Sequence, residues 1–313
     1  SYSSRYVTRY LYKMKQTFDL FLETDYIDFN YDLSNGKNRI SIYKNGQFLC
    51  FYEEIKSVWA HRSDIKIFNY YQQVDESELE YSLGHHITQK ESIRNLLHKK
   101  KCLGRFGKLN FNKLVFLNAC QQLDIKVPNS LVTRKKSDLG KFLANQKNGI
   151  IVKSIAANFH FCVSKNENEQ TWMHGITNAL DIEKYRRLPE EFDLSLFQEK
   201  LDKKFELRVL FIAGICYPQV IFSQKHSFSE VDYRQGLDDK NMRQCGIKLP
   251  HKIIDQINKL MNFLNLNIGC IDIVVTKNGD FVFLEVNPSG IFTDMMDNCN
   301  YDMHYEIAKY LMS

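Results

Sequence analysis

Two short apolar runs near the carboxy end of the sequence carry acidic residues where buried strands are normally apolar. Asp272 interrupts the first run, and Glu285 and Asn287 stand in the second. Side chains alternate between the two faces of a strand, so Glu285 and Asn287 share one face. If the two runs pair through a turn at residues 277–280, Asp272 lies close to both.

Three oxygen ligands brought together in this way favour a divalent cation. Two carboxylates at close range raise each other's pKa unless a positive charge lies between them. Mg²⁺ binds a few carboxylates together with phosphate oxygens and water, which suits a nucleoside triphosphate site. We therefore predict that Asp272, Glu285 and Asn287 are metal ligands. The alternative is a pair of edge strands with both carboxylates in solvent, and the rigid Pro-Ser-Gly turn after Asn287 argues against it.

A second group of candidates lies in a charged segment between two expected strands. The first strand is expected to break here, and the main-chain groups left without partners could meet an adenine edge. Glu206, at the start of the next strand, is placed to accept hydrogen bonds from ribose hydroxyls, and Arg208 lies on the same face. The alternative is an ordinary solvated loop. The segment predicted to contact the nucleotide is Gln198, Glu199, Lys200 and Leu201.

Two lysines stand where the charge of phosphate groups needs them. Lys153 ends the apolar strand expected at residues 150–152, and Lys113 stands at the start of an expected helix beside Asn112. A lysine at the end of a buried strand often only extends its charged end into solvent. A phosphate-binding role for either lysine is therefore a hypothesis that depends on the other site residues.

The elements that must hold these residues alternate between helices and strands with antiparallel hairpins, which predicts the α+β class. Helices are expected at residues 3–14 and 250–264. Asn45 and Gly46 are the strongest short signal for a hairpin. A short strand is also expected at residues 18–22.

The composition is that of a globular protein with several lobes. The chain has 313 residues, too many for one small core, and its 44% hydrophobic and 25% charged residues are ordinary values. We divide it into an N-terminal lobe at 1–108, a central lobe at 109–196 and a C-terminal lobe at 197–313 that contains the metal site. The apolar runs are far shorter than the roughly 20 residues of a membrane span. We also expect no secretory signal.

Cysteine usage and charge indicate a cytoplasmic protein. The eight cysteines are scattered without a C-x-x-C pair, so we expect reduced thiols. The net charge is +5, and the one dense basic run, at residues 98–101, is interpreted as a solvated loop. We expect no nucleic-acid and no membrane partner. His160, Cys162 and His174 could bind zinc, but a fourth ligand is missing and a hairpin is the preferred interpretation.

Considered together, seven of these candidates resemble, in order and spacing, the ATP-grasp superfamily over residues 112–300. Neither a P-loop nor a G-x-G-x-x-G motif occurs in the chain. The seven residues are Lys113, Lys153, Glu199, Glu206, Asp272, Glu285 and Asn287.

Within that superfamily the sequence is more similar to peptide-modifying ligases of the microviridin or graspetide type, including those of grasp-with-spasm systems. "SVWAHR" at 57–62 resembles their N-terminal tryptophan motif, "FQEKLDKKFELRV" their hinge, and "GCIDIVVTKNGDFVFLEVNPSG" their metal strands, while "DYR" at 232–234 matches their loop by the substrate. Three features depart from the family. The family normally opens with a β-strand ahead of the first helix, but Ser1 is expected in the loop after that strand, so either the strand is missing or the chain is numbered from inside it. The segment after Lys153 lacks glycines, and Ile291 replaces a polar residue.

The resemblance implies an ATP-grasp fold of three lobes, with ATP between the central and C-terminal lobes. It implies an ATP-dependent ligase that uses ATP and Mg²⁺ and forms ADP and phosphate. The substrate would be a ribosomal precursor peptide, whose Asp or Glu side chains are joined to Ser or Thr hydroxyls or Lys amines as ω-ester or ω-amide macrocycles. A leader segment of that peptide would bind separately, to a helix and a hairpin of the central and C-terminal region.

The resemblance also implies residue roles. Arg208 and Arg234 would neutralise the transferred phosphoryl group and the acyl phosphate, and Asp232 would orient the nucleophile or act as a base. Lys113 and Lys153 would contact the α- and β-phosphates. Two alternatives are a ligase that adds amino acids to a small molecule or peptide tail, and an ATP-binding regulator without turnover. The sequence leaves open a homodimer, the precursor, the ring topology and the choice between ester and amide.

Overall fold

The structure is a computed structural model in which two compact units divide the chain. The first unit comprises Ser1–Asn110, Leu266–Ile268 and Asp302–Ser313, and the second comprises Phe111–Asn265 and Gly269–Tyr301. The division into three lobes stays a prediction. The structure describes residues 2–34, 39–61, 64–68, 76–107, 112–155, 160–166, 169–174, 177–225 and 242–313, and it describes the backbone alone at residues 2, 76–78, 160–166, 169–174, 178 and 225.

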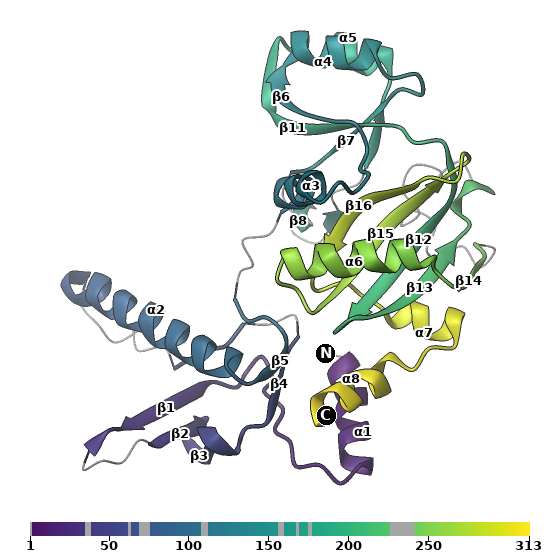
Figure 1. Ribbon diagram of the computed structural model, residues 1–313. Coiled ribbons are helices and arrows are strands. Elements are labelled where there is room, and N and C mark those ends of the chain that lie inside the picture. Colours follow the sequence, from purple (N-terminus) through teal and green to yellow (C-terminus); the bar gives the residue numbers. More distant parts are fainter. Residues whose placement is uncertain are drawn as a thin grey trace. The chain divides into compact units, whose positions relative to one another are not determined.

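The first unit contains a three-stranded antiparallel sheet in the order β1-β2-β3, and a parallel pair formed by β4 and β5 (Figure 1). Its helices include α1, which matches the helix predicted at residues 3–14. The elements are α1 (Tyr2–Lys13), β1 (Ile27–Asp32), β2 (Arg39–Lys44), β3 (Gln47–Phe51), the 3-10 helix η2 (Tyr52–Glu54), β4 (Ser57–Ala60), α2 (Glu76–His98), β5 (Lys101–Gly104) and α8 (Met303–Met312).

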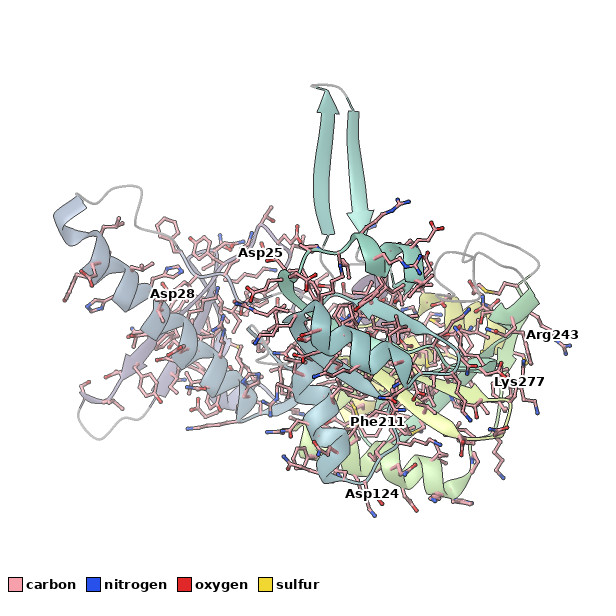
Figure 2. The ribbon with its side chains drawn as sticks, turned by 90° about the horizontal axis from the view of Figure 1, so that it is seen from above. Asp25, Asp28, Asp124, Phe211, Arg243 and Lys277 are labelled. Carbon is pink, nitrogen blue, oxygen red and sulfur yellow. The ribbon has the colours of Figure 1, made fainter. Side chains whose placement is uncertain are left out.

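The hairpin predicted in this unit is confirmed, and the strand predicted before it is wrong. Asn45 and Gly46 have φ values of 52° and 78°, as a two-residue hairpin turn of β2 and β3 requires. Residues 18–22 form no strand, because the chain turns at their end: the Leu22 N–H donates to Asp25 Oδ2 at 2.8 Å. The other oxygen of Asp25, the residue labelled in Figure 2, accepts from Asn45 Nδ2 at 2.7 Å. Asp25 thus fastens this turn to the hairpin tip.

The first unit also holds a partly buried carboxylate between two basic side chains of α2. Asp64 accepts hydrogen bonds from Arg94, and Lys90 Nζ lies 2.8 Å from its Oδ2. Burial by itself raises the pKa of Asp64, but the hydrogen bonds and charges of Arg94 and Lys90 outweigh it, and the pKa is lowered. Asp64 is therefore charged at neutral pH and ties its loop to α2.

The second unit contains a four-stranded sheet in the order β10-β7-β11-β6, a five-stranded sheet in the order β14-β13-β12-β15-β16, and the hairpin of β8 and β9 (Figure 1). The mixture of helices and sheets confirms the predicted α+β class. The elements are α3 (Lys113–Gln122), β6 (Ser130–Lys135), α4 (Lys136–Ala144), β7 (Ile150–Lys153), β8 (His160–Asn166), β9 (Glu169–His174), β10 (Asn178–Leu180), α5 (Ile182–Arg187), β11 (Glu191–Glu199), β12 (Lys203–Ile212), β13 (Ile215–Ile221), the 3-10 helix η4 (Ser223–Lys225), β14 (Gln244–Gly246), α6 (His251–Phe263), β15 (Ile268–Thr276), β16 (Phe281–Asn287) and α7 (Thr293–Cys299).

One face of the five-stranded sheet is apolar and forms a core. Helix α6, which matches the helix predicted at residues 250–264, crosses this face (Figure 1). The terminal methyl of its Met261 lies 3.4 Å from where a Cβ on Gly269 would stand. Burial of the apolar side chains on this face stabilises the sheet. The strand residues that make up the apolar face are Leu207, Val209, Val220, Ile271 and Val286.

The opposite face carries polar side chains from all five strands, and we call it the polar face. The cross-strand partners place them together: Arg208 lies opposite Gln219, and Asp272 opposite Glu285. A sheet with one apolar and one polar face follows from the alternation of side chains along each strand. The members of the polar face are Glu206, Arg208, Gln219, Gln244, Asp272, Glu285 and Asn287.

A β-bulge in β16 sets the position of the acidic residues. Ile273 lies opposite Phe283, but its neighbour Asp272 lies opposite Glu285, so Leu284 is an extra residue. Without this bulge Asp272 would lie opposite Leu284, and Glu285 would face the other side of the sheet. The bulge therefore turns Glu285 onto the polar face.

In the four-stranded sheet, β7 and β11 pair so that Lys153 lies opposite Leu196. Phe197 points to the other face, where it packs with Leu139 of α4 and Ile150 in a small core. Lys153 and Gln198 therefore share the opposite face of the sheet. Among the described residues, no helix combines the length and apolar character needed to cross a membrane.

Candidate functional site

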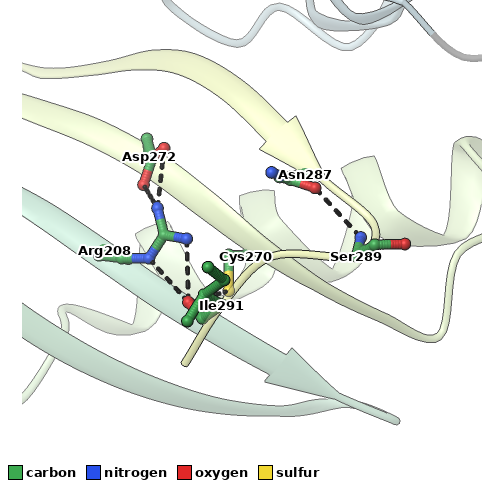
Figure 3. A network of polar contacts seen from close by, with 6 residues as sticks. All are labelled: Arg208, Cys270, Asp272, Asn287, Ser289 and Ile291. Carbon is green, nitrogen blue, oxygen red and sulfur yellow. Dashed lines mark hydrogen bonds and ion pairs between the residues drawn. The ribbon is translucent and has the colours of Figure 1, made fainter. Parts of the chain in front are cut away.

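The three predicted metal ligands lie on one face of the β15–β16 hairpin. Asp272 and Glu285 are direct cross-strand partners, and Asn287 is the partner of Cys270, two residues from Asp272. Asn287 Oδ1 accepts a hydrogen bond from the Ser289 N–H at 3.1 Å (Figure 3). Two carboxylates and an amide oxygen on one face are a donor set that suits Mg²⁺. In the described part of the chain, no group of three or more His, Cys, Asp and Glu side chains could hold a metal.

The metal-ligand candidate Asp272 also holds Arg208. Arg208 Nη1 donates to Asp272 Oδ1 at 2.9 Å and to Oδ2 at 3.2 Å (Figure 3). Both residues are only 9% exposed. Removing one partner of such a buried pair typically destabilises a protein by about 3–5 kcal/mol, because the other charge stays buried. The pair places a guanidinium beside the predicted metal ligands, as the interpretation of Arg208 requires.

Lys113 connects the two sheets of the second unit at the site. It opens α3, whose first amides are capped by the Asn112 side chain, as expected for a helix start. Lys113 Nζ donates to the Ser154 carbonyl at 3.0 Å and lies 4.0 Å from Glu285 Oε2. Because Ser154 directly follows Lys153, the structure brings the predicted phosphate-binding and metal-binding elements together.

Gln198 is held in one orientation by a chain of hydrogen bonds. Ser130 Oγ donates to the Pro128 carbonyl at 2.7 Å, so it accepts from Gln198 Nε2 at 2.9 Å. Gln198 is 1% exposed, and its Oε1 has no hydrogen-bond partner among the described residues. The side chain is therefore a buried part of the sheet next to the strand break.

The predicted strand break is confirmed, but two of its amides are not available to a ligand. β11 ends at Glu199 and β12 begins at Lys203. The Glu199 N–H donates to the Asn129 carbonyl at 3.0 Å, and the Lys200 N–H to the Gly149 carbonyl at 2.9 Å. The Glu199 carboxylate accepts from the Asn129 N–H at 2.8 Å. Within the described chain, the amide in this segment that is left for an adenine edge is that of Leu201.

Glu206 is held by two residues that sequence reasoning missed. Its Oε1 accepts from Lys203 Nζ at 3.0 Å and from Ser223 Oγ at 2.7 Å, and all three residues are buried. A lysine three residues before Glu206 was visible in the sequence as a weak signal. No sequence signal indicated Ser223, because the pairing of β12 with β13 brings it to Glu206.

Two predicted site residues and one residue of a motif that resembles the family lie outside the described residues. Asp232 and Arg234 belong to this group, as does the arginine that ends the "SVWAHR" motif. The zinc alternative also stays untested, since the side chains of His160, Cys162 and His174 are not described.

Comparison with known proteins identifies the fold of the chain. No protein-family model and no curated protein matches the chain. Several solved structures do. The macrocyclase MdnC from Microcystis aeruginosa MRC, bound with precursor peptide MdnA, is 22% identical with a TM-score of 0.74, over 100% of this chain and 96% of that one.

Two further structures contain nucleotide. A RiPP-associated ATP-grasp ligase from Chryseobacterium gregarium, in complex with ADP and a leader and core peptide, is 20% identical with a TM-score of 0.76, over 98% of this chain and 90% of that one. The ATP-grasp ligase PsnB, complexed with minimal precursor, Mg and ADP, is 17% identical with a TM-score of 0.67, over 100% and 93%. The chain therefore has the ATP-grasp fold.

Proposed function

We propose that this chain is a cytoplasmic ATP-dependent ligase that closes ω-ester or ω-amide macrocycles in a ribosomal precursor peptide. One observation carries the proposal: the polar face of the five-stranded sheet holds Asp272, Glu285 and Asn287 beside Arg208, with Lys113 next to Glu285. The fold is shared with structures that contain ADP, Mg and precursor peptides, which supports the same substrates here. None of the seven cysteines with described side chains forms a disulfide, which supports the cytoplasmic location.

The nucleotide would lie between the four-stranded and five-stranded sheets of the second unit. The Leu201 amide would bind the adenine edge, with Gln198, Glu199 and Lys200 forming the wall behind it. Glu206, held by Lys203 and Ser223, would accept hydrogen bonds from the ribose. Lys113 and Lys153 would bind the phosphates, where an ammonium group acts as a compact positive charge.

Asp272, Glu285 and Asn287 would hold Mg²⁺. When bound, the ion neutralises phosphate charge and orients the phosphate groups. Arg208, kept in place by Asp272, neutralises the phosphoryl group that is transferred. These residues position groups and neutralise charge, which is most of what phosphoryl transfer requires of a protein.

The chemistry converts an unreactive carboxylate into an electrophile. A peptide Asp or Glu oxygen attacks the γ-phosphorus of ATP, the bond to ADP breaks, and an acyl phosphate forms. A hydroxyl or amine of the same peptide then attacks the acyl carbon, loses its proton and expels phosphate. Each ring therefore removes one water from the peptide. We propose that Arg234 neutralises the acyl phosphate and that Asp232 orients the nucleophile or accepts its proton.

The test is a reaction with a candidate precursor. The peptide would come from a short neighbouring reading frame that ends in clusters of Ser, Thr or Lys with Asp or Glu. Purified chain, ATP, Mg²⁺ and this peptide are incubated, and mass spectrometry follows the peptide while ADP and phosphate are measured. We expect the loss of one water per ring, and no loss when the acidic core residues are replaced by amides.

Other outcomes separate the alternatives. A peptide mass that rises by an added amino acid would identify a tail-adding ligase. Tight ATP binding without ADP formation, with every leader-bearing peptide tried, would identify a nucleotide-binding regulator. Either result contradicts the macrocyclase proposal.

A further inference from the structure

Arg208 is held from two sides by groups of different charge. Asp272 accepts from its Nη1, as described above. On the other side the main-chain carbonyl of Ile291 accepts from Arg208 Nε at 3.3 Å and from Nη2 at 3.0 Å (Figure 3). The same carbonyl lies 3.7 Å from Cys270 Sγ. A neutral main-chain oxygen is therefore the second anchor of the guanidinium.

A tight turn that begins at Asn287 delivers this carbonyl. The Gly290 N–H donates to the Asn287 carbonyl at 3.1 Å, and the Asn287 side chain accepts from the Ser289 N–H at 3.1 Å. Both the main-chain carbonyl and the side chain of Asn287, a predicted metal ligand, thus close the turn. The metal ligands and Arg208 are therefore connected through the turn as well as through Asp272.

Gly290 is required for the turn to come this close. A Cβ on Gly290 would lie 2.5 Å from both Cβ and Sγ of Cys270 and 3.3 Å from Arg208 Nη2. Contacts of 2.5 Å are far below van der Waals separation, so any side chain here must push the turn away from β15. The Ile291 side chain is 55% exposed and takes no part in this packing.

We propose that the Ile291 carbonyl, placed by Gly290, is a positioning group that keeps Arg208 aimed at the transferred phosphoryl group while Asp272 engages the metal ion. This inference rests on the proposed function. A carboxylate that binds a cation gives up part of its hold on a guanidinium, and the cation repels the guanidinium. A carbonyl keeps two hydrogen bonds to Arg208 without neutralising its charge, which stays available to the phosphate. Because the anchor is a main-chain carbonyl, the residue type at position 291 is free to vary.

The direct test reads the Arg208 Nε–H signal by ¹⁵N NMR of arginine-labelled protein, without peptide or turnover. Arg208→Lys assigns the signal by removing it. We expect Gly290→Ala to move the signal toward those of solvent-exposed arginines, and Gly290→Ala with Cys270→Gly to move it back. Gly84→Ala is the control, because a Cβ there meets nothing within 4 Å. An Nε–H signal that Gly290→Ala leaves unchanged would overturn the proposal.

A second measurement uses the unmodified chain and does not depend on the folding of a variant. Mg²⁺ and ADP are added to the labelled protein. We expect the Nε–H of Arg208 to stay at its hydrogen-bonded position, because Ile291 keeps hold of it. A shift to the exposed position on binding contradicts the proposal. Both NMR results can be obtained even if no peptide is cyclised, so failure of the inference and failure of the proposed function are distinguishable.

Kinetics then test whether Gly290 acts through Arg208. Displacing a catalytic group by about 1 Å can lower the rate about 10²-fold. We expect Gly290→Ala to lower kcat by about that factor with little change in the KM for ATP, and by less than about twofold in the Arg208→Lys background. Equal losses in both backgrounds would show that Gly290 acts on folding alone and would overturn the proposal.

Discussion

The two faces of the five-stranded sheet are built from the same strands but differ in role: the apolar face forms a core, and the polar face carries the candidate site. On the apolar face, Ile271 and Val286 pack beneath α6 and are almost fully buried. On the polar face, at the residue after Ile271 and the residue before Val286, Asp272 and Glu285 stand opposite each other beside Arg208. Because successive side chains of a strand point to opposite faces, a stabilising core and a charged site lie on the two sides of the same sheet.

The difference shows how a sheet can carry charges that do not stabilise it. A buried ion pair is often no more stabilising than apolar residues of the same volume, because desolvation offsets the attraction. The polar face can therefore be kept for its chemistry, since the apolar face and α6 supply the stability. Variants on the polar face that keep the Arg208–Asp272 pair should mainly lower activity, and variants on the apolar face should mainly lower the free energy of unfolding.

The largest expected effect is on the polar face. Glu285→Gln replaces one carboxylate of the predicted metal site with a neutral amide while keeping the shape of the side chain. We expect turnover to fall by at least about 10² to 10³-fold, with nucleotide binding weakened but measurable. Phosphate release and calorimetry with ADP and Mg²⁺ measure the two effects. Glu183→Gln on an exposed helix face is the matched control, and unchanged turnover in Glu285→Gln would rule out the metal role.

The corresponding change beneath the apolar face is Leu260→Ala. Leu260 of α6 is fully buried. Deleting Cγ and both Cδ carbons there should lower the free energy of unfolding by about 2–5 kcal/mol, through lost burial and the cavity left behind. Chemical denaturation measures this. Turnover per folded molecule should stay close to that of the unmodified chain, and a large selective loss of turnover would break the comparison between the two faces.

A smaller effect is expected at the ribose-binding candidate. Glu206→Gln weakens its hydrogen bonds with Lys203 and Ser223 and with the ribose hydroxyls. Hydrogen bonds to a charged group contribute about 1.5–3 kcal/mol, so the KM for ATP should rise roughly tenfold or more with a small change in kcat. Steady-state kinetics over a range of ATP concentrations test this. A change in kcat alone would contradict the assignment.

The smallest effect concerns Asp64 of the first unit, whose ion pairs with Arg94 and Lys90 are partly exposed. The pKa of Asp64 is lowered in the folded chain. Its contribution to stability is therefore present above its unfolded pKa and disappears as the pH falls through its folded pKa. We expect Asp64→Asn to lower stability by no more than about 1 kcal/mol at pH 7, with the difference vanishing in acid. A difference that grows in acid would contradict the pKa direction.

Local sequence signals were sufficient for the hairpin of β2 and β3, since Asn and Gly tolerate the left-handed backbone that a two-residue turn needs. The same kind of signal failed at residues 18–22. Their composition suits a strand, but the Asp25 side chain, held by Asn45, turns the chain at Leu22. The deciding hydrogen bond joins residues 20 positions apart, which no local pattern contains.

The candidate site likewise has features that local sequence signals predict and features that they do not. The types and order of Asp272, Glu285 and Asn287 indicated oxygen ligands on paired strands. Near their turn, however, β15 and β16 pair one residue out of the register that places Asp272 opposite Glu285. The bulge at Leu284 restores that register. A slip of one residue would have put Glu285 among the apolar residues beneath α6.

By itself, the sequence determined the strands, the turn between them and the acidic character of their ends, because alternation and turn chemistry act over a few residues. Only the tertiary structure decided that Arg208 lies between Asp272 and the Ile291 carbonyl. Arg208 and Ile291 are 83 positions apart, and the contact exists because β12 pairs beside β15 and Gly290 lets the turn pack on Cys270. Such contacts depend on which strands become neighbours and on the space between their side chains. Neither can be inferred from a local sequence pattern.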